Sequence, residues 1–248
     1  MLSFDFYNPV KLVYGQGQVE RIGELAKDWG KKALIISYED VSFYGDLFSR
    51  IHSRLEENGI QWVDCFAATP NPKLSEARKA IDLGKKEGVD FVIGVGGGSA
   101  MDLSKVVAAG ILYPHDLKRM IKFSHADDSQ ILPTEALPTI MIPTLPATAS
   151  EMNPTAVITD EETLRKSYVW EPSCLYPKVS ILDPVLTTTL PAYQTACGGL
   201  DAISHAAEPF LFSDEATYGN IDLQSNMQLA VMKTIYENLA RVLEHPDD

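Results

Sequence analysis

The sequence predicts an α/β protein, in which helices cover both faces of a parallel sheet, followed by the start of an all-helical region. Two observations predict this fold class. Short β-branched runs alternate with helical patterns over about the first 150 residues, and the chain has helical patterning from Pro191 onward. Several runs are apolar on both faces, as strands buried in parallel sheets are. We therefore expect an α/β domain over 1–187 and the first part of a helical domain over 188–248.

The expected elements follow in order along the chain. Expected strands are 32–37, 60–66, 90–95 and 138–144, and the helices between them are 19–30, 46–59, 74–88 and 99–110. After residue 150 the pattern changes, and 155–160 and 178–183 are expected to form an antiparallel excursion. The segment from about 220 to 243 has helical spacing, and little chain remains to cover its apolar face. We therefore expect this sequence to be the front part of a longer protein.

Composition excludes several classes of protein. The formal charge of −13 argues against nucleic acids and anionic membranes as partners, because both would repel the chain. Cys65, Cys174 and Cys197 are widely spaced, so neither a disulfide scaffold nor a thiolate zinc site is indicated. No signal peptide is visible, and no apolar run approaches the ~20 residues that span a bilayer. A reducing, cytoplasmic location is expected.

A glycine-rich junction between an expected strand and an expected helix is the most informative stretch. Gly96, Gly97, Gly98 and Ser99 stand there, where glycines let the backbone approach a phosphate and the N–H groups of the helix complete an anion site. The alternative is a tight turn in which Ser99 caps the helix and Asp102 takes part in a capping box. Beside a pyrophosphate, Asp102 would have to face a sugar hydroxyl or an amide.

A second loop, 142–153, also leaves an expected strand. Its hydroxyl groups are those of Thr144, Thr148 and Ser150. Because both loops follow strands of one sheet, this loop can line the other wall of a nucleotide crevice. By itself it is an ordinary loop rich in proline and threonine.

Asp201 and His205 stand four residues apart among small residues. That spacing places both side chains on one face of a helix. The pair can supply two metal ligands, or it can be a plain helix pair worth a few tenths of a kcal/mol. The residues alone leave both interpretations open.

Together these stretches resemble the iron-containing (group III) alcohol dehydrogenase family, most closely its butanol-dehydrogenase-like branch. The resemblance is carried, in order, by 96–102, 143–153, 181–191 and 198–208. It implies a Rossmann-like, dinucleotide-binding domain over 1–187 and the start of a metal-binding helical domain over 188–248. The implied reaction is hydride transfer between a nicotinamide cofactor and a primary alcohol or aldehyde, in a homodimer or larger homo-oligomer.

The loops described above, the end of the first strong strand and the resemblance together indicate the site residues. The expected cofactor contacts are Asp40, Asn71, Gly97, Gly98, Ser99, Asp102, Thr144, Leu145, Thr148 and Lys166, and the expected ligands of a divalent metal (Fe²⁺ or Zn²⁺) are Asp201 and His205. Two further family ligands would come from later helices. Lys166 can instead be a solvated hairpin lysine, and Asn71 part of a simple Asn-Pro turn. Ala149 stands where the family usually has glycine.

The acidic residues that follow the first strong strand bear on the choice of cofactor. Glu39 and Asp40 stand where a dinucleotide fold meets the adenosine ribose, and a carboxylate there repels a 2′-phosphate. We therefore expect NAD(H) rather than NADP(H). Two other interpretations stay open: a dehydroquinate-synthase-like lyase that binds NAD and a metal, and a non-catalytic nucleotide-binding fragment if the native chain ends at 248.

Overall fold

The computed structural model of the chain describes residues 5–121, 129–213 and 221–246. The chain divides into two compact units. The larger comprises Pro9–Thr144 and Ala149–Leu186, and the smaller comprises Met1–Asn8, Leu145–Thr148 and Thr187–Asp248. The smaller unit therefore takes in a short piece of the second loop.

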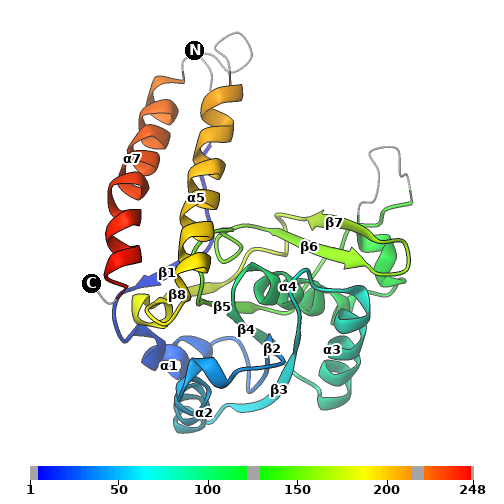
Figure 1. Cartoon of the computed structure of the whole chain (residues 1–248). Helices are drawn as coiled ribbons and strands as arrows, with labels where there is room; N and C mark the ends of the chain where they lie inside the picture. Colours follow the sequence, from blue (N-terminus) through cyan, green and yellow to red (C-terminus); the bar gives the residue numbers. More distant parts are fainter. Residues whose placement is uncertain (1–4, 122–128, 214–220, 247–248) are drawn as a thin grey trace. The chain divides into compact units, whose positions relative to one another are not determined.

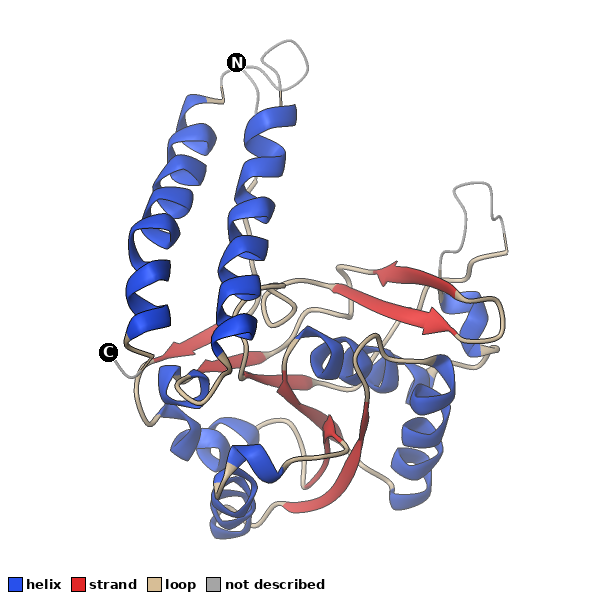
Figure 2. Cartoon of the chain, viewed as in Figure 1, coloured by secondary structure: helices blue, strands red, loops and turns tan. Residues whose placement is uncertain are grey.

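The larger unit is built on one parallel sheet of six strands (Figures 1 and 2). In spatial order the strands are β1 (Lys11–Tyr14), β8 (Val179–Leu182), β5 (Thr139–Pro143), β4 (Phe91–Gly96), β2 (Lys32–Tyr38) and β3 (Gln61–Ala68). The helices are α1 (Ile22–Ala26), α2 (Leu47–Glu57), α3 (Leu74–Glu87) and α4 (Gly98–Leu112), and the short 3-10 turns are η1 (Gln18–Arg21), η2 (Ser42–Tyr44), η3 (Leu117–Met120) and η4 (Pro184–Thr187). The predicted α/β class with a parallel sheet is confirmed.

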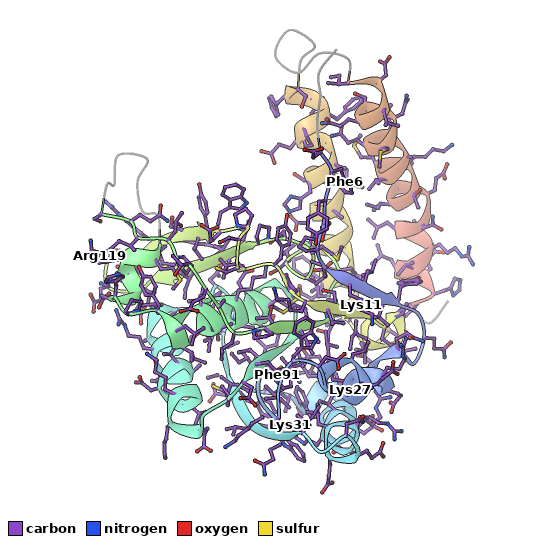
Figure 3. The ribbon with its side chains drawn as sticks, turned by 180° about the vertical axis from the view of Figure 1, so that it is seen from behind. Phe6, Lys11, Lys27, Lys31, Phe91 and Arg119 are labelled. Atoms are coloured by element: carbon purple, nitrogen blue, oxygen red, sulfur yellow. The ribbon has the colours of Figure 1, made fainter. Side chains whose placement is uncertain are left out.

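Alternating strand residues fill two cores, one on each face of the sheet. In β2, Leu34 and Ile36 join the core under α3 and α4, whereas Ala33 and Ile35 join the core under α1 and α2. Phe91 is fully buried in the second core, and Figure 3 shows its side chain inside the larger unit. Because both faces of these strands are covered, their sequences are almost continuously apolar.

The segment after residue 150 corrects one expectation. β6 (Thr155–Asp160) pairs antiparallel with β7 (Arg165–Trp170) as a separate two-stranded hairpin. The prediction that 178–183 belongs to this antiparallel excursion is wrong, because β8 returns to the main sheet and lies parallel to both β1 and β5. Its burial gives the physical reason: Val179 and Ile181 fill the core on the α1 and α2 side.

The described part of the smaller unit consists mainly of two long helices, α5 (Ala192–Phe212) and α7 (Asp222–Glu244), which lie side by side (Figure 1). Gly199 of α5 permits their close approach, since a Cβ at that position would lie 2.6 Å from the Leu239 Cδ1 of α7. Among the described residues, no helix is both long and apolar enough to cross a membrane.

Candidate functional site

The glycine-rich junction connects the end of β4 to the start of α4. Gly96 has φ +145°, and a Cβ there would lie 2.8 Å from the Ala100 Cβ and 2.9 Å from the Tyr38 Cε2. The position therefore needs glycine on grounds of both backbone and space. Gly97 is the N-cap of α4, with φ −82° and ψ −171°, and Gly98 is the first helical residue. The first N–H groups of a long helix thus stand at the carboxyl edge of the sheet, a geometry that suits an anion.

The alternative in which Ser99 caps the helix is wrong. The N-cap is Gly97, which has no side chain to cap with, and the Ser99 hydroxyl instead accepts a hydrogen bond from the Asn71 N–H at 3.3 Å. Asp102 is likewise not in a capping box. Its Oδ1 accepts from the Ser150 hydroxyl at 2.6 Å, and its Oδ2 accepts from the Val157 N–H at 3.0 Å. The side chains at the start of α4 therefore bind other segments of the unit.

Three of the expected cofactor residues form one cluster. Lys166 of β7 donates from Nζ to the Asn71 Oδ1 at 2.8 Å, while the Asn71 N–H contacts Ser99. Asn71 has φ +58°, a left-handed conformation that asparagine tolerates better than most residues. The β6–β7 hairpin thus brings Lys166 to a turn 95 positions earlier in the chain. Asn71 thus connects Lys166, through its side chain, to Ser99 near the start of α4, through its backbone N–H.

Two tyrosines at this edge were not predicted from the sequence. The Tyr38 hydroxyl takes hydrogen bonds from the backbone of Gly97 and Ala100, and burial raises the pKa of Tyr38. The Tyr44 hydroxyl lies 3.1 Å from the Thr144 Oγ1, and burial raises the pKa of Tyr44 to about 12. Both phenols therefore stay protonated near neutral pH. The sequence could have indicated Tyr38 by its position, because it is the last residue of a buried strand and so lies at the carboxyl edge of the sheet.

The second loop begins in the larger unit and continues in the smaller one. Thr144 is buried, and its N–H donates to the Gly96 carbonyl at 3.0 Å, which joins the ends of β5 and β4. Leu145 and Thr148 belong to the smaller unit. Within that unit, a Cβ at Gly198 would lie 2.7 Å from the Pro146 carbonyl oxygen. Gly198 therefore lets α5 pack closely against this part of the loop.

Ala149 has φ +51°, the left-handed conformation that favours glycine. We predict that Ala149→Gly raises the free energy of unfolding by about 0.5–1 kcal/mol, because the ~1–2 kcal/mol cost of a left-handed alanine exceeds the extra entropy of glycine. Urea denaturation measures this change. The control, Ala147→Gly, removes a methyl group where φ is not positive and should be destabilising. A less stable Ala149→Gly protein would contradict the prediction.

Asp40 lies exposed just beyond the end of β2. Its Oδ1 accepts a hydrogen bond from the Ser42 N–H at 2.9 Å. Hydrogen bonds from the Ser42 hydroxyl and backbone hold the pKa of Asp40 below its usual value. The carboxylate is therefore charged and has a fixed position at the carboxyl edge of the sheet.

Asp201 and His205 lie one turn apart on α5. The His205 Nε2 is 3.7 Å from the Asp201 Oδ2, and the two side chains are 59% and 47% exposed. An imidazole nitrogen and a carboxylate oxygen fit a divalent metal in kind. They fall short in number, since no group of three or more His, Cys, Asp or Glu residues that could hold an ion occurs in the described ranges. Within the described ranges, the pair therefore offers at most two donors to an ion.

Comparison with known proteins gives consistent matches over the whole chain. A sequence model described as "Iron-containing alcohol dehydrogenase" matches residues 9–184. NADH-dependent butanol dehydrogenase A of Clostridium acetobutylicum is 37% identical over all of this chain and 61% of its own length. A probable NADH-dependent butanol dehydrogenase 2 of Bacillus subtilis is 36% identical over 98% of this chain and 60% of its own length.

The structural comparison agrees with the sequence comparison. The crystal structure of NADH-dependent butanol dehydrogenase A from Thermotoga maritima superimposes with a TM-score of 0.89 at 37% identity. The match covers 99% of this chain and 59% of that one. The chain therefore spans about three fifths of the length of the relatives that it matches.

Proposed function

This chain belongs to the iron-containing alcohol dehydrogenase family, and we propose that the complete protein transfers a hydride between NAD(H) and a primary alcohol or aldehyde with the aid of a divalent metal. The observation that carries the proposal is the convergence of Asn71, Ser99 and Lys166 on the glycine-rich start of α4. We further propose that the protein works as a homodimer or larger homo-oligomer, without nucleic acid or membrane.

The larger unit binds the dinucleotide in this proposal. The backbone at Gly97 and Gly98 receives the pyrophosphate at the helix N-terminus, where N–H groups and the helix dipole favour negative charge. Lys166 adds an ammonium group that can pair with a phosphate oxygen, and Asn71 orients it. Thr144 presents a buried hydroxyl at the end of β5, and Leu145 and Thr148 follow it in the second loop and are proposed as further cofactor contacts. Asp102 supports this site by accepting hydrogen bonds from Ser150 and the Val157 N–H, which hold the second loop and β6 against α4.

The smaller unit contributes the chemistry at the substrate oxygen. Asp201 and His205, one turn apart on α5, would supply one oxygen and one nitrogen donor to Fe²⁺ or Zn²⁺. When bound, such an ion supplies Lewis acidity, so that hydride transfer needs no strong protein base. Removing Asp201 and His205 would take away two ligands from a metal site that needs three or four.

Alcohol-dependent formation of NADH by the complete protein tests the proposal. Butan-1-ol or a similar primary alcohol should produce NADH in proportion to the alcohol consumed, measured by NADH absorbance. A dehydroquinate-synthase-like lyase would use NAD⁺ without net formation of NADH. Binding of NAD⁺ with no net reduction by any primary alcohol would therefore exclude the dehydrogenase.

The carboxylate at Asp40 predicts the choice of dinucleotide. We expect the parent to bind NADH about tenfold more tightly than NADPH, because like charges ~4 Å apart cost on the order of 1 kcal/mol or more. Glu39→Gly combined with Asp40→Ser should reduce this preference. Fluorescence titrations with both dinucleotides give the four dissociation constants. Tighter NADPH binding by the parent, or an unchanged ratio in the double variant, would overturn this assignment.

A further inference from the structure

Lys105 is a fully buried lysine on α4, with 0% of its surface exposed. Its Nζ donates three hydrogen bonds, to the Ser150 Oγ at 2.9 Å, the Asn153 Oδ1 at 3.1 Å and the Thr155 carbonyl at 2.7 Å. Three donors therefore meet three acceptors, and the ammonium group is satisfied. All three acceptors come from the end of the second loop and the first residue of β6.

Asp102 lies one turn earlier on α4 and also contacts the segment formed by the end of the second loop and the start of β6. Ser150 connects the two charged groups, since its hydroxyl accepts from Lys105 and donates to Asp102. Asp102 also accepts from the Val157 N–H of β6. The helix that begins with the proposed phosphate site is thus bound to the loop that forms the opposite wall.

The charged groups of the network around Lys105 are two carboxylates and two ammonium groups, so their formal charges balance. Asp102 and Glu151 face Lys105, while Lys166 acts on Asp102 from β7, and Asp102 in turn acts on Tyr38 of β2. Burial lowers the pKa of Lys105 to about 8, although both carboxylates oppose that change. Burial also raises the pKa of Asp102, and the charge of Lys105 opposes that change. Without Lys105, Asp102 would therefore take up a proton more readily, which would weaken the hydrogen bonds that it accepts from Ser150 and the Val157 N–H.

We propose that Lys105 is a positioning residue for the dinucleotide: its ammonium group fixes the end of the second loop against α4 and balances the charge of Asp102 behind the phosphate site. The proposal rests on the dinucleotide-binding function argued above. Lys105 itself does not contact the cofactor. It acts through Ser150 and Asp102.

The test compares two variants with two matched controls. Lys105→Met keeps most of the side-chain volume and removes the charge, and Ser150→Ala removes only the bridging hydroxyl. Lys32→Met removes a lysine that pairs with Glu87 and lies at the start of β2. Ser104→Ala removes a buried hydroxyl that donates to the Ala100 carbonyl of its own helix. NADH affinity is measured by fluorescence titration on protein that unfolds cooperatively.

Lys105→Met should weaken NADH binding at least tenfold, and Ser150→Ala should weaken it severalfold, whereas the controls should bind as the parent does. A second readout separates positioning from general destabilisation. Between about pH 7 and pH 9 the parent should lose affinity as Lys105 releases its proton and one of its three acceptors loses a donor. The loss should be absent in Lys105→Met, since methionine has no titratable group at this position.

The outcomes distinguish this proposal from the function on which it rests. A parent that binds no NADH overturns the dinucleotide-binding function and the role of Lys105 together. A parent that binds NADH, with Ser150→Ala and a folded Lys105→Met protein binding equally well, overturns only the role of Lys105. If Lys105→Met fails to fold, the result for Ser150→Ala and the pH profile of the parent decide the question.

Discussion

Gly98→Val should lower the affinity for NADH by about a hundredfold or more, because the branched side chain would occupy the space into which the pyrophosphate must enter. Loss of two hydrogen bonds to a charged group costs about 3 kcal/mol or more, which corresponds to that factor. The fold should tolerate the change, because Gly98 is the first residue of α4 and does not have a positive φ. Valine and glycine also differ little in helix propensity.

Fluorescence titration with NADH measures this loss, and urea denaturation checks that the variant is folded. Gly98→Ala is the graded control, since one methyl group should give a smaller loss than the valine side chain. Gly96→Val serves the opposite purpose. It should destabilise the fold itself, because a Cβ there would collide with Ala100 and Tyr38. Unchanged NADH affinity in a folded Gly98→Val protein would rule out this junction as the phosphate site.

His205→Ala in the complete protein should reduce turnover by about a thousandfold, with a parallel loss of bound metal. One ligand is removed from a set of three or four, and the Lewis acidity of the ion is worth several kcal/mol, each ~1.4 kcal/mol being tenfold in rate. Elemental analysis and steady-state kinetics on one preparation measure both quantities. In the 248-residue chain the same substitution should change metal content little, because Asp201 and His205 alone hold an ion weakly.

His52→Ala is the matched control for that substitution. His52 lies in the α/β unit, where its Nε2 is 3.0 Å from the Asp64 Oδ1 and its ring stacks on Trp62. Its loss should leave metal content and turnover unchanged. Tightly held, stoichiometric metal in the 248-residue chain would contradict the view that it contains only part of the ligand set.

Strong local patterns made most of the larger unit predictable. β2 and β4 are apolar on both faces, and α3 carries a clear helical period, so their positions were predicted to within about two residues. β1 was missed because only Val13 of its four residues is buried. β8 was assigned to the wrong sheet, since a short apolar run does not reveal its partner. Pairing across 168 positions is decided by packing and not by local sequence.

The sequence could predict which residues belong to the candidate site but not which of them contact one another. The sequence indicated Asn71, Ser99 and Lys166 one at a time, and only the folded chain shows that Asn71 contacts both of the others. Lys105 was missed altogether. A lysine within a helical pattern normally indicates a solvated face, and nothing in the sequence tells that three acceptors from distant residues will bury it.

The pairing of β1 with β8 has a consequence for the order of folding during synthesis. Lys11 pairs with Val179, and the other neighbour of β8 is β5, so β1 has no partner in the sheet until about residue 182 has been made. The strands β2, β3 and β4 can pair much earlier, because they are close in sequence. Of the six strands, β1 is therefore synthesised first and waits longest for its partner, and an unpaired strand during that interval is the kind of edge that favours pairing with another chain.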